Sequence, residues 1–289
     1  MSKIIENNSR IMKLQNLTLL LRDGLANRMR VIASIAHLAK QGVKVEVLWS
    51  KNWALNCNFE DLFEPIDGID IKNITKEPVY YDTIQNSTLK KLYSKLHGLI
   101  HGYDYIFYSP GLKFEKQLSD NDFMQNIFCQ NKRVFLTTCF CVTATQDYSV
   151  FKPKEEITTI QNQIKLPSKY IGIHIRRGDN VASMENSRIE GFIDIIKHEI
   201  SINHEVRFFL ATDSYDVKTM LKIVFGTDRI ISKDNTISRD SEKGIKEALA
   251  EMIILSNADK IIGSACSTFN EIAALLHNTE LIKVTTTKC

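Results

Sequence analysis

The sequence lacks any apolar run of the roughly 20 residues that a transmembrane helix requires. Its first ten residues are polar and lack the apolar stretch of a secretory signal. We therefore expect a soluble, cytoplasmic protein without a transmembrane segment, with peripheral attachment at the cytoplasmic face of a membrane left open.

Glycine is also scarce, and the glycine motifs of common nucleotide-binding proteins are missing. The 289 residues include 12 glycines, with no G-x-G-x-x-G and no G-x-x-x-x-G-K-[ST]. A dinucleotide-binding fingerprint and a P-loop are thereby excluded.

Charge of one sign does not dominate the sequence, because 37 basic and 34 acidic side chains are interspersed and give a net charge of +3. This pattern argues against a nucleic-acid-binding track, while anionic ligands remain compatible with it.

Cysteines are few and lack the spacing of a zinc site. The six cysteines are scattered, several within apolar segments, and are read as free thiols in a reducing compartment. Cys139 and Cys141 form a C-x-C without a second pair. A D-x-D at Asp120 to Asp122, a pattern of metal-dependent transferases, falls in a polar turn before a helical pattern and favours a helix cap. No essential metal is predicted.

Short apolar runs alternate with helical patterns along nearly the whole chain. This alternation predicts an α/β fold with mostly parallel sheets, arranged as two Rossmann-like domains that face a central cleft. A charged segment with two prolines precedes residue 168, so we place the domains at 1–165 and 166–289. The predicted strands are 17–21, 43–49, 104–108, 133–137, 170–175, 206–211, 229–231, 259–262 and 281–284.

The first helix should follow Asp23-Gly24, a turn signal. Leu25, Met29, Ile32, Ala36 and Ala39 have the spacing of one buried helix face. Asn27 and Arg28 would then lie in the first turn, at the carboxyl end of the first strand, where open α/β sheets bind ligands.

The run His174-Ile-Arg-Arg-Gly-Asp179 ends a predicted strand and is the most informative feature of the chain. Ile171, Ile173 and Ile175 form one face, and the opposite face becomes polar toward the carboxyl end. Although paired arginines are often only exposed surface, guanidiniums at a strand end can bind a doubly charged anion through forked donors. We interpret Arg176 and Arg177 as a diphosphate site.

Two further strand ends carry polar residues. The apolar run Phe208 to Ala211 ends in the polar pair Thr212-Asp213, and Asp213 either caps the next helix or anchors a ligand hydroxyl or the arginine pair. Ser267 and Thr268 open a helix after the strand near 259–262. Thr268 and Glu271 match a capping box, and the same helix start could bind phosphate, so the two interpretations are compatible.

An amphipathic pattern predicts a helix over residues 241–256, with Ile245, Leu249, Met252 and Ser256 buried. Glu247 and Glu251 share another face, which would ordinarily be solvated. Glu251, however, lies within an otherwise apolar run, and a carboxylate there could accept both donors of a guanine edge.

Together these segments resemble the fucosyltransferase-like glycosyltransferases of GT-B architecture, which include α1,2-, α1,6- and protein O-fucosyltransferases and rhizobial nodulation fucosyltransferases. The matches follow the family's order over residues 17 to 284. They are the H-x-R-R-x-D hexamer at 174–179, Asp23 to Arg28, Leu210 to Asp213, and Leu255-Ser256 through Ser267-Thr268-Phe269.

The resemblance implies inverting, metal-independent transfer of L-fucose from GDP-fucose to a glycan or glycoconjugate hydroxyl. The donor would be bound mainly by the C-terminal half, with Arg176 on the β-phosphate. The implied donor-binding residues are Asn27 and Arg28 of the first helix together with His174, Arg176, Arg177, Asp213, Glu251, Ser267 and Thr268. The N-terminal half would present the acceptor. Family members commonly have Asp at the Glu251 position and glycines at the positions of Asp23 and Ala26.

A base must accept the proton of the acceptor hydroxyl, and Asp179 and Glu185 are the carboxylates closest to the hexamer. In the α1,6 branch a Glu shortly after the motif has this role, but strict spacing places Met184 there. Arg176, Asp179 and Glu185 are thus the candidate catalytic residues. The alternatives are a nucleotide-sugar-binding homologue without turnover and a transferase with another nucleotide-sugar donor.

Overall fold

The computed structural model describes residues 12–77, 88–108, 121–178, 180–233 and 240–285. The chain divides into two compact units, each with one five-stranded sheet whose strand pairs are all parallel. The N-terminal unit comprises Met1–Asp23, Arg30–Asn52 and Pro65–Val150, and the C-terminal unit comprises Gly24–Met29, Trp53–Glu64 and Phe151–Cys289. The predicted parallel α/β architecture is confirmed.

The N-terminal sheet has the strand order β3-β2-β1-β5-β4, so β1 occupies its centre. Every residue of β1 from Leu17 to Leu21 is buried, as expected of a central parallel strand. The strands are β1 (Asn16–Leu21), β2 (Lys44–Ser50), β3 (Ile69–Ile74), β4 (Tyr105–Tyr108) and β5 (Arg133–Thr137). The helices of this part of the chain are α1 (Leu25–Lys40), α2 (Thr88–His101) and α4 (Asn121–Gln130), with a 3-10 turn, η1, at Tyr148–Val150.

The C-terminal sheet has the order β10-β9-β6-β7-β8, with the strand that carries the hexamer at its centre. Its strands are β6 (Ile171–Ile175), β7 (Phe208–Thr212), β8 (Ile230–Ile231), β9 (Lys260–Ser264) and β10 (Glu280–Val284). Its helices are α5 (Glu155–Asn162), α6 (Val181–Asn186), α7 (Ile189–Ile202), α8 (Tyr215–Phe225), α9 (Glu242–Ser256) and α10 (Thr268–His277).

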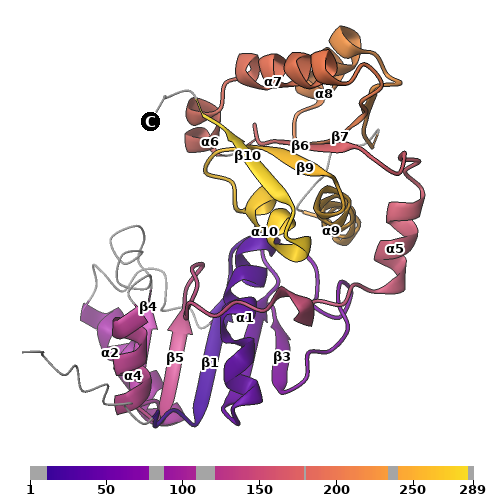
Figure 1. Cartoon of the computed structure of the whole chain (residues 1–289). Coiled ribbons are helices and arrows are strands. Elements are labelled where there is room, and N and C mark those ends of the chain that lie inside the picture. The colour runs from indigo at the N-terminus through magenta and orange to yellow at the C-terminus, as the bar shows by residue number, and fades with distance from the viewer. Residues whose placement is uncertain (1–11, 78–87, 109–120, 179, 234–239, 286–289) are drawn as a thin grey trace, which may run out of the picture. The chain divides into compact units, whose positions relative to one another are not determined.

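Helices cover both faces of the C-terminal sheet, with α7 and α8 on one side and α9 and α10 on the other (Figure 1). Ile171, Ile173 and Ile175 pack with Phe192 and Ile196 of α7 in the core on the first side. Gly172 faces the second side, where a Cβ would lie 2.9 Å from Leu255. The predicted alternation of side chains between the two faces of β6 is confirmed. Because both faces are packed, the position of the strand's carboxyl end is fixed.

The division between the units falls at Val150 and Phe151, whereas the sequence places the boundary near residue 166. Helix α5 lies between these positions and packs against α9. Lys246 of α9 also pairs with Glu156 of α5 at 2.7 Å. These contacts tie the segment that precedes β6 to the C-terminal unit.

Candidate functional site

The three residues after β6, Arg176, Arg177 and Gly178, form a short loop that we call the arginine loop. The carboxylate of Asp213, at the end of β7, binds it at three points. Its Oδ1 accepts a hydrogen bond from the Arg177 backbone N (2.7 Å), and its Oδ2 accepts one from the Gly178 backbone N (3.1 Å). Oδ2 also lies 2.9 Å from Nη1 of Arg176. One carboxylate therefore fixes both the backbone of the loop and its first guanidinium.

The loop approaches Asp213 so closely that only glycine fits at position 178. A Cβ added there would lie 2.9 Å from Oδ2 of Asp213. Ser214, one residue later, is the N-cap of α8 and accepts a hydrogen bond from the Val217 backbone N. The capping role considered for Asp213 is thus wrong, and its role as anchor of the arginine pair is confirmed.

Arg177 is bound on its other side, at a junction of three segments. Its Nη2 donates to the backbone carbonyl of Ser187 (2.6 Å). The Ser187 hydroxyl accepts from the Ala265 backbone N (2.7 Å) and donates to the Val284 carbonyl (2.5 Å). Burial lowers the pKa of Arg177, and Asp213 and Glu190 act in the opposite direction. The two guanidiniums are therefore held differently. That of Arg176 pairs with the Asp213 carboxylate, and that of Arg177 donates to the Ser187 carbonyl.

His174 lies on β6, two residues before Arg176. It is buried against Phe269, and the two ring centroids are 4.8 Å apart. Burial, together with the nearby Arg176 charge, lowers its pKa to about 3. Its Nδ1 is buried without a hydrogen-bond partner among the described residues. The imidazole is therefore neutral at physiological pH, and it adds no positive charge that would repel the guanidinium beside it.

The turn from β9 to α10 lies beside the arginine loop. Ser264 Oγ accepts a hydrogen bond from the Arg176 backbone N (3.0 Å), and Asn180 Nδ2 donates to the Cys266 carbonyl (2.9 Å). Cys266 has a positive φ of 54°, which reverses the chain before the helix. The N-cap of α10 is Ser267, without a capping side-chain bond. The capping box predicted from Thr268 therefore has the wrong register, and helix position N1 is Thr268.

Gly263, the second-last residue of β9, leaves no room for a side chain. A Cβ on Gly263 would lie 1.9 Å from Nδ2 of Asn270, a buried side chain that donates to the Ser264 carbonyl (2.8 Å). We expect Gly263→Ala to lower the free energy of unfolding by about 2–3 kcal/mol, because neither group can move without losing a buried bond. Denaturant unfolding measures this change.

Two controls separate this clash from a general loss of glycine. Gly24→Ala should cost less than about 1 kcal/mol, since a Cβ there meets only an ordinary contact of 3.9 Å to Ala54. In an Asn270→Ala background, Gly263→Ala should cost less than in the wild type, because the clashing amide is gone. An equal cost in both backgrounds would contradict the assigned clash.

Glu247 and Glu251 of α9 are both buried, so neither acid lies on a solvated face. Glu247 pairs with Lys233 at 3.0 Å, and Lys218 Nζ donates to the Lys233 carbonyl (2.7 Å). Glu251 Oε2 is buried without a hydrogen-bond partner within the described residues. Burial raises the pKa of Glu251 to about 8, against the attraction of Lys218 and Lys233. One oxygen of the Glu251 carboxyl group thus lacks a partner, within the electrostatic influence of two lysines.

The other predicted site residues occupy different places. Asn27 and Arg28 lie in the first turn of α1 as expected, with Arg28 fully buried. Glu185 lies on α6, directly after the arginine loop, and is exposed to solvent. Asp179 lies outside the described residues, as does Asp120 of the D-x-D. The predicted residues that lie together at one edge of one sheet are therefore Arg176, Arg177, Asp213, His174 and the turn at Ser267.

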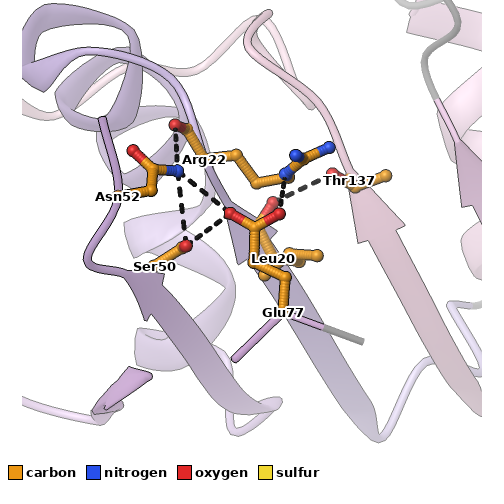
Figure 2. Close-up of polar contacts among 6 residues, drawn as sticks. All are labelled: Leu20, Arg22, Ser50, Asn52, Glu77 and Thr137. Atoms are coloured by element: carbon orange, nitrogen blue, oxygen red, sulfur yellow. Dashed lines mark hydrogen bonds and ion pairs between the residues drawn. The ribbon is translucent and has the colours of Figure 1, made fainter. Parts of the chain in front are cut away.

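The N-terminal unit has a polar cluster at the corresponding edge of its own sheet, which the sequence analysis missed (Figure 2). Glu77, just beyond β3, pairs with Arg22 Nε after β1. It also accepts hydrogen bonds from Ser50 Oγ at 2.5 Å and Asn52 Nδ2 at 2.9 Å, both at the end of β2. The available signal was the polar residues that follow β1, β2 and β3, of which the sequence-based prediction used only Asp23 to Arg28.

The described part of the chain contains no group of three or more His, Cys, Asp or Glu side chains that could hold a metal ion. Among its helices, none combines the length and apolar character needed to cross a bilayer. The five described cysteines are free thiols.

No protein-family model and no curated protein matches the sequence. Solved structures do match over nearly the whole chain. The fucosyltransferase NodZ from Bradyrhizobium has a TM-score of 0.57 at 16% identity, covering 91% of this chain and 93% of that chain. POFUT1 in complex with GDP has a TM-score of 0.52 at 10% identity, covering 94% of this chain and 98% of that chain.

A mutant of FUT1 from Arabidopsis thaliana has a TM-score of 0.53 at 16% identity, with 93% of this chain and 70% of that chain covered. These neighbours are GT-B fucosyltransferases, so the predicted GT-B-like fold is confirmed. The resemblance noted in the sequence therefore extends to the three-dimensional fold.

Proposed function

We propose that this protein is a glycosyltransferase that transfers L-fucose from GDP-fucose to a hydroxyl of a glycan or glycoconjugate. The observation that carries the proposal is the arginine loop, which Asp213 holds at the carboxyl edge of a parallel sheet. One crystal structure of NodZ was soaked with GDP-fucose, and the structures of POFUT1 and of the FUT1 mutant are complexes with GDP. A fold shared with these enzymes supports a GDP-sugar as the donor.

The arginine loop provides the diphosphate site. Arg176 binds the β-phosphate, and the start of α10 at Ser267 and Thr268 adds backbone N–H donors and the positive end of a helix dipole. His174 is neutral and stacks on Phe269, so it adds no charge next to Arg176 and does not compete for the anion. Asn27 and Arg28 complete the donor side, at the start of α1.

The reaction is a displacement at the anomeric carbon of fucose. The acceptor oxygen forms a bond to C1 as the bond from C1 to the β-phosphate oxygen breaks, and GDP leaves with that electron pair. The acceptor proton passes to a carboxylate, for which Glu185 and Asp179 are the candidates. Attack opposite the leaving group inverts the anomeric configuration.

Negative charge develops on the β-phosphate as the bond to the sugar breaks. A fixed guanidinium that is already in position stabilises this charge without a reorganisation cost. In this proposal the arginines take the role that a divalent ion has in metal-dependent transferases. Transfer should consequently persist in EDTA.

Glu251 is proposed to read the guanine base. Its Oε2 is buried, near two lysines, and has no hydrogen-bond partner among the residues described. A carboxylate can accept both the N1–H and the N2–H of guanine, a pair of donors that uracil lacks. The longer side chain of Glu, relative to the Asp common in the family, keeps the same chemistry.

We expect Glu251→Gln to weaken GDP binding by about tenfold and to remove the preference for GDP over UDP, since an amide offers only one acceptor atom. Binding calorimetry with GDP and UDP measures both effects. Glu247→Gln is the matched control, because Glu247 is also buried on α9 but already pairs with Lys233. Equal losses in the two variants would contradict base reading by Glu251.

The pH dependence provides a second test of this residue. The pKa of Glu251 is about 8 in the folded protein and 4.5 for an ordinary, solvated Glu, so Glu251 retains its proton in the fold when an unfolded chain has lost it. Stability of the free protein should therefore fall as pH rises from 4.5 to 8, and Glu251→Gln should flatten this decline. GDP binds the ionised form, so wild-type affinity for GDP should rise over pH 7 to 8.

A donor screen tests the proposed function as a whole. Purified protein is incubated with GDP-fucose, GDP-mannose and UDP-sugars, with and without EDTA, and nucleotide release is measured. Release of GDP from GDP-fucose above the other donors supports the proposal. Turnover of another donor alone would assign that donor instead, and binding without any release would assign a nucleotide-sugar-binding protein.

A further inference from the structure

Helix α2 packs against the N-terminal sheet through a histidine and a glycine. The ring of His97 lies 6.0 Å from the rings of both Tyr103 and Phe135. Gly98 is buried, and a Cβ there would lie 2.8 Å from Ile106 of β4. His101 is stacked on Tyr103 at 6.0 Å. Burial lowers the pKa of His97, so the inner face of the helix is largely uncharged.

The apolar residues of α2 point the other way. Leu92, Leu96, Leu99 and Ile100 are 62%, 49%, 78% and 72% exposed, and we call them the apolar stripe. Their spacing of i, i+4, i+7 and i+8 places them on one side of the helix. A surface helix of a soluble protein normally buries such a stripe against its own core. In α2 the apolar stripe instead faces solvent. Such an exposed apolar surface indicates an interaction site for a membrane or another apolar partner.

The charged residues of α2 and of the first residues of β5 and its preceding turn are basic. Residues 88–102 contain three lysines and two histidines and no acidic residue. Lys95 is exposed on α2, and Lys132 and Arg133 are exposed at the adjoining start of β5. Asp104, the first acid after the helix, accepts hydrogen bonds from the backbone N of Lys132 and Arg133 at 2.8 and 2.9 Å. The stripe is therefore bordered by basic side chains.

We propose that α2 is a membrane-docking helix that inserts its apolar stripe into the interface of an anionic lipid bilayer. With 14 residues the helix is about 21 Å long, too short to span the hydrocarbon core, and it lies in the plane of the interface. Its lysines contact anionic headgroups. A second copy on the same surface would bring two basic borders together, so charge favours lipid over self-association. This inference is independent of the proposed function.

The test is co-sedimentation of the full-length protein with lipid vesicles. We expect binding to vesicles that contain about one-quarter phosphatidylglycerol, at least about tenfold stronger than to pure phosphatidylcholine and weaker at high salt. Leu99→Glu with Ile100→Glu should reduce this binding about tenfold or more. Leu92→Gln with Leu99→Gln should also reduce it, which separates lost apolar contact from added negative charge.

The matched control is Ile223→Glu with Val224→Glu on α8, where the exposed fractions are 78% and 51%. This variant should bind vesicles like the wild type, and melting temperatures verify that all variants fold. Equal losses in the α2 and α8 variants, or no vesicle binding by the wild type, would overturn the proposal. Self-association that depends on the apolar stripe, detected by light scattering, would assign the surface to a second copy instead.

Discussion

Arg176→Ala is expected to lower the rate of GDP release from GDP-fucose by at least about 100-fold, the usual loss when a fixed donor to a developing charge is removed. Arg176 is held 2.9 Å from Asp213 and is only 16% exposed, so its guanidinium is in place before the donor binds. Arg176→Lys should recover part of the rate, because an ammonium keeps the charge but lacks the planar fork.

Binding measurements locate the effect on the β-phosphate. Arg176→Ala should weaken GDP about tenfold or more and leave GMP unchanged, because GMP lacks that phosphate. The control is Arg207→Ala, which removes a guanidinium at the opposite end of the same sheet, just before β7. Retention of more than a tenth of the wild-type rate in Arg176→Ala would refute the role assigned to Arg176.

The overall fold could be predicted because its central strands are continuously apolar. Nine of the strands lie within two residues of their predicted positions. The missed strand, β3, is an edge strand in which Ile69, Ile71 and Ile74 are separated by Asp70, Lys72 and Asn73. Only one neighbour, β2, pairs with it, so its sequence does not show the apolar run on which the prediction relied.

The position of the arginine loop could be predicted because the loop follows an apolar strand, whereas the N-cap of α8 depends on tertiary packing. Spacing alone could not decide whether Asp213 or Ser214 caps α8, because both are good N-cap residues. The arginine loop decides it, since it offers three donors to Asp213. That contact joins residues more than 30 positions apart, which local patterns do not report.

The burial of Glu251 has a similar cause. A single amphipathic stripe predicts one buried face for α9, but α5, α10 and the sheet all pack against this helix. Glu247 and Glu251 therefore enter the interior together with the predicted apolar face. Both acids of α9 are buried through this packing, which the helical period of the sequence does not report.

The second large effect is expected for Asp213→Ala. The substitution leaves the backbone N–H groups of Arg177 and Gly178 without their acceptor and Arg176 without its ion partner. Asp213 touches no reacting atom in the proposed reaction and acts as a positioning residue. We expect kcat to fall about 100-fold with a smaller change in KM, because a misplaced guanidinium loses most in the transition state.

Three comparisons distinguish positioning from general destabilisation. Asp213→Asn should lie between the wild type and Asp213→Ala, since one amide oxygen can still accept a backbone hydrogen bond but the charge is lost. Asp216→Ala, an exposed acid in the first turn of α8, should retain wild-type activity. In Asp213→Ala the affinity for GDP should fall while that for GMP stays constant. Tighter GDP binding would show that Asp213 competes with the phosphate for Arg176, and parallel losses of GDP and GMP binding would show that the whole donor site has collapsed.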